Sequence, residues 1–87
     1  PVIKARLAAL MLEQGKMDEA RKLADEVLKK NPDLPLALLV KAKLDFRAGR
    51  FDEALASLDR VLKNTPDNLE ALYLRAVVYS RMAKPEM

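Results

Sequence analysis

The chain has 87 residues, of which 51% are hydrophobic and 33% are charged, and its net charge is +3 at pH 7. This length allows one small domain, and the composition is typical of a folded helical protein and excludes a disordered one. Acidic and basic residues are interleaved without a run of five like charges, so we expect no nucleic-acid partner. The apolar runs are much shorter than a bilayer span, which excludes membrane insertion.

We predict five helices, which in chain order cover residues 2–14, 17–30, 35–48, 51–63 and 69–82. Apolar residues recur at helical spacing in the second and fourth segments, which begin with acidic residues and end with lysines. Gly15 and Gly49 favour the left-handed conformation that ends a helix, and Pro32 and Pro66 stop the helices before them. The loops are short, so consecutive helices should pack antiparallel.

The sequence repeats itself with a period of 34 residues, because twelve of the first 32 residues are identical to the residue 34 positions later. Such a period predicts stacked copies of one supersecondary unit. We divide a single domain, 1–87, into repeats over 1–32 and 33–66 and a half repeat over 67–87. The residues expected to let the repeats pack closely return at this period: Ala8, Gly15, Ala20, Pro32, Ala42, Gly49, Ala54, Pro66 and Ala76.

A helix pair with this period and these small residues resembles the tetratricopeptide repeat (TPR) family. The resemblance covers essentially the whole chain and implies an all-α fold, a right-handed superhelix of antiparallel helix pairs with about two and a half repeats. Three positions depart from the pattern, and one of them is Met11, where the third repeat has Tyr79. Lys4 stands where the later repeats have Leu38 and Leu72. Asp45 stands where an aromatic residue is expected, so we predict looser packing there or a local partner such as Arg47, Arg50 or a backbone amide.

The sequence offers no residues for catalysis or for binding a cofactor. It contains no histidine and no cysteine, so the commonest general base, the usual metal ligands and a thiol nucleophile are lacking. The two glycines stand apart and form no phosphate loop. We therefore expect neither an enzyme nor a protein that needs a cofactor or metal.

Function is expected instead on a surface. The resemblance implies that the first helix of each pair lines a concave side that holds a protein or peptide. Mapped onto this chain, the groove residues are Ala9, Leu12, Leu39, Lys43, Phe46, Arg47, Tyr73, Val77 and Arg81. Apolar side chains with a few cations suit a peptide or amphipathic helix that carries apolar anchors and carboxylates. A competing interpretation is that Leu39 and Phe46 only pack between neighbouring repeats.

Some members of the TPR family clamp the C-terminal carboxylate of chaperones with cations on these helices. Only Lys43 offers a suitable cation here, so we expect no such clamp. An RNA-reading helical repeat would need paired polar side chains at fixed places in every repeat, and none recur. The remaining alternative is a structural spacer, or a segment that forms a homodimer or homo-oligomer through its apolar last helix.

The cellular compartment is not fixed by the sequence. No signal peptide is recognisable, and the cytoplasm and the bacterial periplasm both fit a chain without cysteine. Because the first residue is Pro1 and both ends lack polar caps, we expect a fragment of a longer repeat array.

Overall fold

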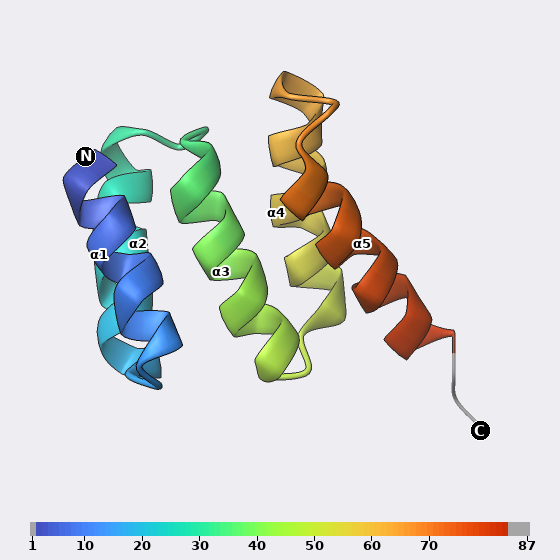
Figure 1. The fold of residues 1–87 in the computed structure, drawn as a ribbon, viewed down its shortest axis with the longest axis horizontal. Helices are drawn as coiled ribbons and strands as arrows, with labels where there is room; N and C mark the ends of the chain where they lie inside the picture. The colour runs from blue at the N-terminus through green and yellow to red at the C-terminus, as the bar shows by residue number, and fades with distance from the viewer. Residues whose placement is uncertain (1, 84–87) are drawn as a thin grey trace.

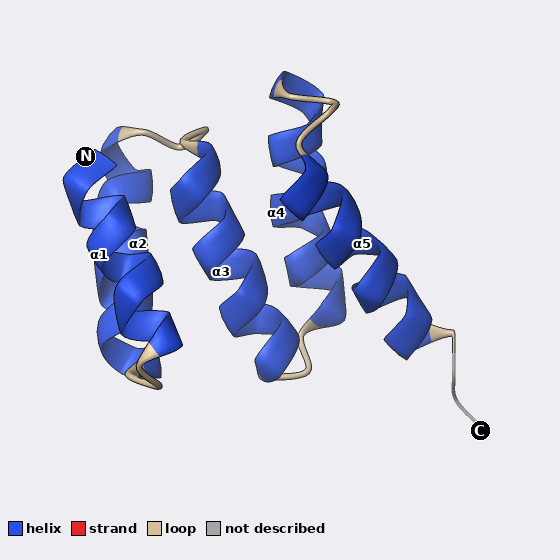
Figure 2. Cartoon of the chain, in the orientation of Figure 1, coloured by secondary structure: helices blue, strands red, loops and turns tan. Residues whose placement is uncertain are grey.

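The chain folds into five helices. The structure is a computed structural model that describes residues 2–83. The helices are α1 (Val2–Glu13), α2 (Met17–Lys30), α3 (Pro35–Arg47), α4 (Phe51–Asn64) and α5 (Leu69–Met82). Residues 2–83 contain no strand, as Figure 2 shows, so the all-α prediction is confirmed. Each predicted helix boundary lies within one residue of the observed one.

The two glycines end α1 and α3 as the sequence predicts. Gly15 and Gly49 have φ angles of 81° and 82°, in the left-handed region that glycine adopts without strain. The next residue then turns back, and the Lys16 amide donates to the Met11 carbonyl at 2.8 Å. A Cβ atom at either glycine would meet no neighbour within 4 Å. Backbone conformation alone therefore accounts for glycine at these two positions.

The starts of α3 and α5 are marked by local signals in the sequence. Pro35 occupies the first turn of α3, where its missing amide hydrogen costs nothing. The side chain of Asn68 caps α5 by accepting a hydrogen bond from the Ala71 amide at 2.9 Å. Asp33 does not cap α3, since Leu34 is the N-cap residue; the Asp33 carboxylate pairs with the Arg60 guanidinium on α4 at 2.6 Å.

The helices form two layers, which Figure 1 shows one behind the other. The near layer contains α1, α3 and α5, the first helices of the three repeats, and the far layer contains α2 and α4. Helix α3 packs against all four other helices, whereas α2 and α4 do not contact each other. The first helices therefore make the more continuous layer, and a groove of about 300 Å³, lined by Leu28 of α2 and by Ala56 and Ser57 of α4, lies between the second helices.

Two larger apolar clusters and a smaller one hold the layers together. Of the larger two, the first joins α1, α2 and α3, and the second joins α3, α4 and α5; the smaller one, of Ala5, Val27 and Ala37, also joins α1, α2 and α3. Small side chains sit at their centres: Ala8, Ala20 and Ala54 are completely buried, and Ala42 is 2% exposed. Alanine at these positions lets the helix backbones approach closely, and a larger side chain would have to push them apart.

Five residues from the predicted packing set lie at the surface instead, and two of them are Gly15 and Gly49 in the turns after α1 and α3. Pro32 and Pro66 are exposed in the turns after α2 and α4. Ala76 is also exposed, although it corresponds to the buried Ala8 and Ala42. The physical reason is that α2 covers Ala8 and α4 covers Ala42, whereas no helix within residues 2–83 lies over Ala76.

Candidate protein-interaction surface

The predicted groove residues divide into buried and accessible side chains. Leu12 and Leu39 are only 3% and 5% exposed and belong to the two larger apolar clusters, so they support the helix stack from within. The accessible or half-buried members lie on the first helices and are here called the first-helix face: Ala9, Lys43, Phe46, Arg47, Tyr73, Val77 and Arg81. This face is smaller than the sequence predicts, because neighbouring helices cover its two leucines.

Phe46 is the centre of this face and links three helices. Its ring lies 5.7 Å from the ring of Phe51 on α4, with an angle of 52° between the two planes. The Arg81 guanidinium of α5 lies 5.3 Å from the centroid of the same ring. A cation over an aromatic ring at a partly exposed site contributes about 0.5–1 kcal/mol. The structure thus brings together Phe46 and Arg81, which the sequence places 35 residues apart.

An ion pair forms a second link between α3 and α5. The Lys43 ammonium contacts the Glu70 carboxylate at 2.6 Å, and the two side chains are 34% and 47% exposed. Such an accessible pair contributes no more than about 1 kcal/mol, so another carboxylate can replace Glu70 at little cost. Helix α5 otherwise packs mainly on α4 and touches α3 only lightly. Two weak polar contacts therefore connect the first helices on this side.

The third cation, Arg47, makes only a weak contact with the rest of the protein. It is exposed at the end of α3, and its Nη1 donates a weak hydrogen bond to the Met17 sulfur at 3.7 Å. Tyr73 is 67% exposed and offers a large amphipathic ring on α5. Val77 and Ala9 are half-buried. The first-helix face thus presents two aromatic rings, two aliphatic side chains and three cations.

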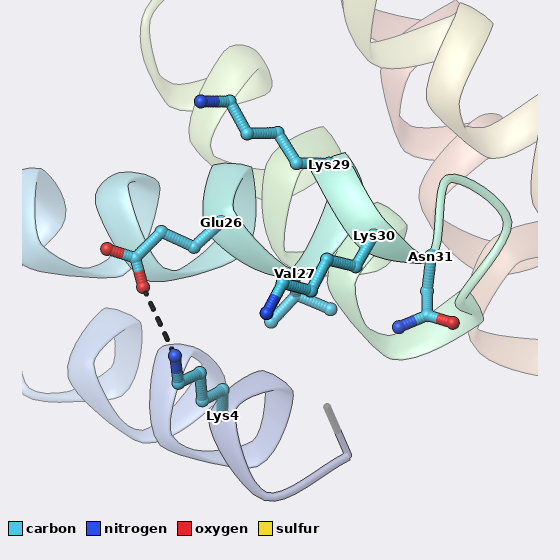
Figure 3. Close-up of a pocket in the computed structure, with 6 residues that line it drawn as sticks. All are labelled: Lys4, Glu26, Val27, Lys29, Lys30 and Asn31. Atoms are coloured by element: carbon cyan, nitrogen blue, oxygen red, sulfur yellow. Dashed lines mark ion pairs between the residues drawn. The ribbon is translucent and has the colours of Figure 1, made fainter.

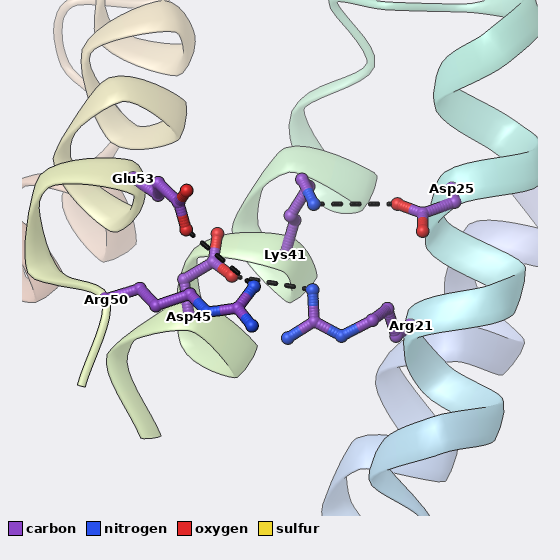
Figure 4. Close-up of polar contacts among 6 residues, drawn as sticks. All are labelled: Arg21, Asp25, Lys41, Asp45, Arg50 and Glu53. Atoms are coloured by element: carbon purple, nitrogen blue, oxygen red, sulfur yellow. Dashed lines mark hydrogen bonds and ion pairs between the residues drawn. The ribbon is translucent and has the colours of Figure 1, made fainter. Parts of the chain in front are cut away.

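Asp45 is buried rather than loosely packed. It is 1% exposed, and its carboxylate accepts a hydrogen bond from Nη1 of Arg21 on α2 at 3.5 Å, as Figure 4 shows. The expected partners Arg47 and Arg50 are not the ones that pair with it, and Arg50 pairs instead with Glu53. Helix α2 of the preceding repeat supplies the cation, which inspection of neighbouring residues in the sequence could not reveal.

Two ion pairs lie at equivalent positions, 34 residues apart in the sequence. Asp25 on α2 lies 3.6 Å from the Lys41 ammonium on α3, which Figure 4 also shows. The corresponding Asp59 on α4 lies 3.7 Å from Nη1 of Arg75 on α5. These contacts were not predicted from the sequence, although the aspartates are identical and a base follows each one at the same distance along the chain. Both pairs join a second helix to the first helix of the next repeat.

A cavity of about 500 Å³ opens between the start of α1 and the end of α2, and Figure 3 shows the residues that line it. Lys4 and Glu26 lie on opposite walls and form an ion pair at 3.6 Å. In the second repeat, the position of Lys4 is taken by Leu38, which is buried in the core. The unusual lysine noted in the sequence therefore coincides with a poorly filled space.

Two further observations concern the described residues alone. Within residues 2–83, no three acidic side chains are placed to hold a metal ion. No helix in that range combines the length and apolar character needed to cross a bilayer.

Comparison with known proteins places this arrangement in a family. No curated protein matched the chain. The family model described as "Psidin, N-terminal TPR repeats region" matches residues 8–87, which confirms the resemblance drawn from the 34-residue period. TPR regions generally mediate contacts between proteins and are generally non-catalytic. Because the match spans nearly the whole chain, this protein belongs to the family of the Psidin N-terminal TPR repeats region.

Proposed function

We propose that the chain is a non-catalytic interaction module that binds a peptide or amphipathic helix along the first-helix face. The observation that carries this proposal is the grouping of Phe46, Lys43 and Arg81 between α3 and α5. An aromatic ring beside two cations is suited to a ligand that combines an apolar anchor with carboxylates. The lack of histidine and cysteine in the sequence supports a role in binding rather than in catalysis.

The contacts of the three cations indicate how a ligand would bind. A ligand carboxylate near Lys43 would take the place of Glu70, exchanging one accessible ion pair for another. A second carboxylate would approach Arg47, whose present partner is only a thioether sulfur. Apolar side chains of the ligand would then contact Phe46 and Val77 between these two points. Acidic peptides with large apolar residues at helical spacing are the expected ligand class.

The same contacts argue against a clamp for a chaperone tail. Lys43 is the single cation at a matching position. A terminal carboxylate needs several convergent donors to be held specifically, and the first repeat offers only Ala5 and Ala9 at the equivalent places.

The proposal can be tested without knowing the natural partner. Short displayed peptides of random sequence would be selected on the immobilised chain. The selected peptides should be rich in acidic and large apolar residues, and their binding should be lost in the double variant Phe46→Ala, Arg47→Glu. Circular dichroism should show that this variant keeps its helices. A matched control, Ala56→Glu on the exposed side of α4, should bind as the unmodified chain does.

Two results would overturn the proposal. Selection of peptides that bind the double variant and the unmodified chain equally well would place binding elsewhere. Alternatively, the Ala56→Glu control could abolish binding while the double variant retains it, which would point to the groove between α2 and α4.

A further inference from the structure

The ion pair between Lys43 and Glu70 is a local feature of the first-helix face. The two ion pairs that join a second helix to the next first helix lie at equivalent positions, so they belong to the packing that the repeats share. The residues 34 positions before Lys43 and Glu70 are instead Ala9 and Leu36, which carry no charge. Stacking of the first helices therefore does not require an ion pair at this place.

The surroundings of this pair leave it accessible. Helices α1 and α3 pack closely on each other, whereas α5 packs mainly on α4 and contacts α3 only lightly. The side chains of Lys43 and Glu70 are 34% and 47% exposed, and the distance between their charged atoms is 2.6 Å. A ligand carboxylate can therefore reach the Lys43 ammonium by displacing the Glu70 side chain.

Glu70 loses little when it is displaced from Lys43. It lies in the first turn of α5, where the partial positive charge of the helix N-terminus stabilises a carboxylate without any lysine. Its side chain is already about half exposed, so water replaces the lost partner. The Lys43 ammonium meanwhile exchanges one carboxylate for another. The exchange is thus close to even in free energy.

We propose that Glu70 is an intramolecular competitor for Lys43, which lowers the affinity of the first-helix face for acidic ligands. This inference rests on the proposed function, because it requires that ligands bind to that face. A ligand carboxylate pairs with Lys43 only after the existing pair is broken, and it also approaches the negative charge of Glu70. A ligand with an uncharged side chain at this place meets neither obstacle. Glu70 therefore reduces the preference of the face for acidic over neutral ligands.

The affinity of an acidic peptide selected on the unmodified chain tests the inference, with fluorescence anisotropy of the labelled peptide as the readout. Glu70→Gln keeps the size of the side chain and removes its charge, so the peptide should bind about two- to fivefold more tightly at low salt. The gain should shrink as the salt concentration rises, because the charged groups are accessible. The matched control Glu53→Gln removes a charge from an accessible ion pair on α4 and should leave the affinity unchanged.

Two further measurements separate competition from a structural role. The acidic residues of the peptide are replaced by glutamine one at a time, and one of these replacements should abolish the gain from Glu70→Gln. Lys43→Gln in the chain should abolish it as well. Thermal unfolding should show that Glu70→Gln is slightly less stable than the unmodified chain, because it loses the ion pair and the interaction with the helix N-terminus. A purely structural residue would instead weaken binding when its loss destabilises the chain.

The outcomes distinguish failure of this inference from failure of the proposed function. If Phe46→Ala with Arg47→Glu abolishes binding but Glu70→Gln leaves it unchanged or weakens it, ligands bind on the first-helix face and Glu70 does not compete with them. If the gain from Glu70→Gln persists beside Lys43→Gln, or if Glu53→Gln gives the same gain, net charge alone explains it and the inference is wrong. If the double variant binds as the unmodified chain does, ligands bind elsewhere and both proposals are wrong.

Discussion

Replacing Lys4 with leucine should stabilise the chain, because the cavity beside Lys4 occupies the place that Leu38 fills in the second repeat. Lys4 holds its ammonium out toward Glu26, and the two side chains are 59% and 50% exposed. A leucine would instead turn toward Val27, the buried residue on the floor of the cavity. Val27 corresponds to Val61, which belongs to the same apolar cluster as Leu38.

The expected change in the free energy of unfolding is the sum of two opposing contributions. Complete burial of a leucine contributes about 1.5–3 kcal/mol. Leu28 of the preceding repeat packs against the cluster that contains Leu38, and residues 2–83 supply no such neighbour for position 4, so we take about half of that gain, roughly 0.8–1.5 kcal/mol. Loss of the exposed Lys4–Glu26 pair costs no more than about 0.5 kcal/mol. The net stabilisation is about 0.3–1.5 kcal/mol, or roughly 1–12 °C in Tm.

Urea and thermal unfolding, followed by helical circular dichroism, measure this difference. The control Lys4→Gln removes the ion pair without filling the cavity and should lower stability by no more than about 0.5 kcal/mol. If Lys4→Leu were no more stable than Lys4→Gln, the cavity would not be the counterpart of the Leu38 site. Positions 4 and 38 would then not be structurally equivalent, although they are 34 residues apart.

Three further substitutions test the packing. Ala54→Leu should destabilise by about 1–3 kcal/mol in urea unfolding, since Ala54 is completely buried, whereas Ala56→Leu at an exposed site should change little. Arg21→Leu should cost about 1–3 kcal/mol, because it leaves the buried Asp45 carboxylate without its partner, and adding Asp45→Asn should recover part of that loss. Gly49→Ala should cost about 1–2 kcal/mol in the same assay, through its positive φ alone; a loss much larger than this would indicate a steric clash.

The helices could be predicted almost to the residue because local chemistry marks their ends. Gly15 and Gly49 need a conformation that other residues avoid, and proline and asparagine mark the starts of α3 and α5. These signals act between neighbours in the chain. The 34-residue period then predicts where the small buried residues lie, because the helices of each copy pack in the same way.

The surface was harder to predict because it depends on how closely helices approach. Helical periodicity assigns Leu39 to the side that carries Lys43, but it cannot show that neighbouring helices cover Leu39 and leave Tyr73 exposed. The ion pairs were missed for a related reason. Arg21 and Asp45 are 24 residues apart, and only the stacking of α2 on α3 brings them together.

The most direct test of the account is a nuclear magnetic resonance titration of the isotope-labelled chain with a peptide selected on it. We predict that the largest shifts occur on the first-helix face, at Lys43, Phe46, Val77 and Arg81, and that Phe46→Ala with Arg47→Glu removes them. Shifts confined to α2 and α4 would contradict the account, since they would place binding on the opposite layer of the structure.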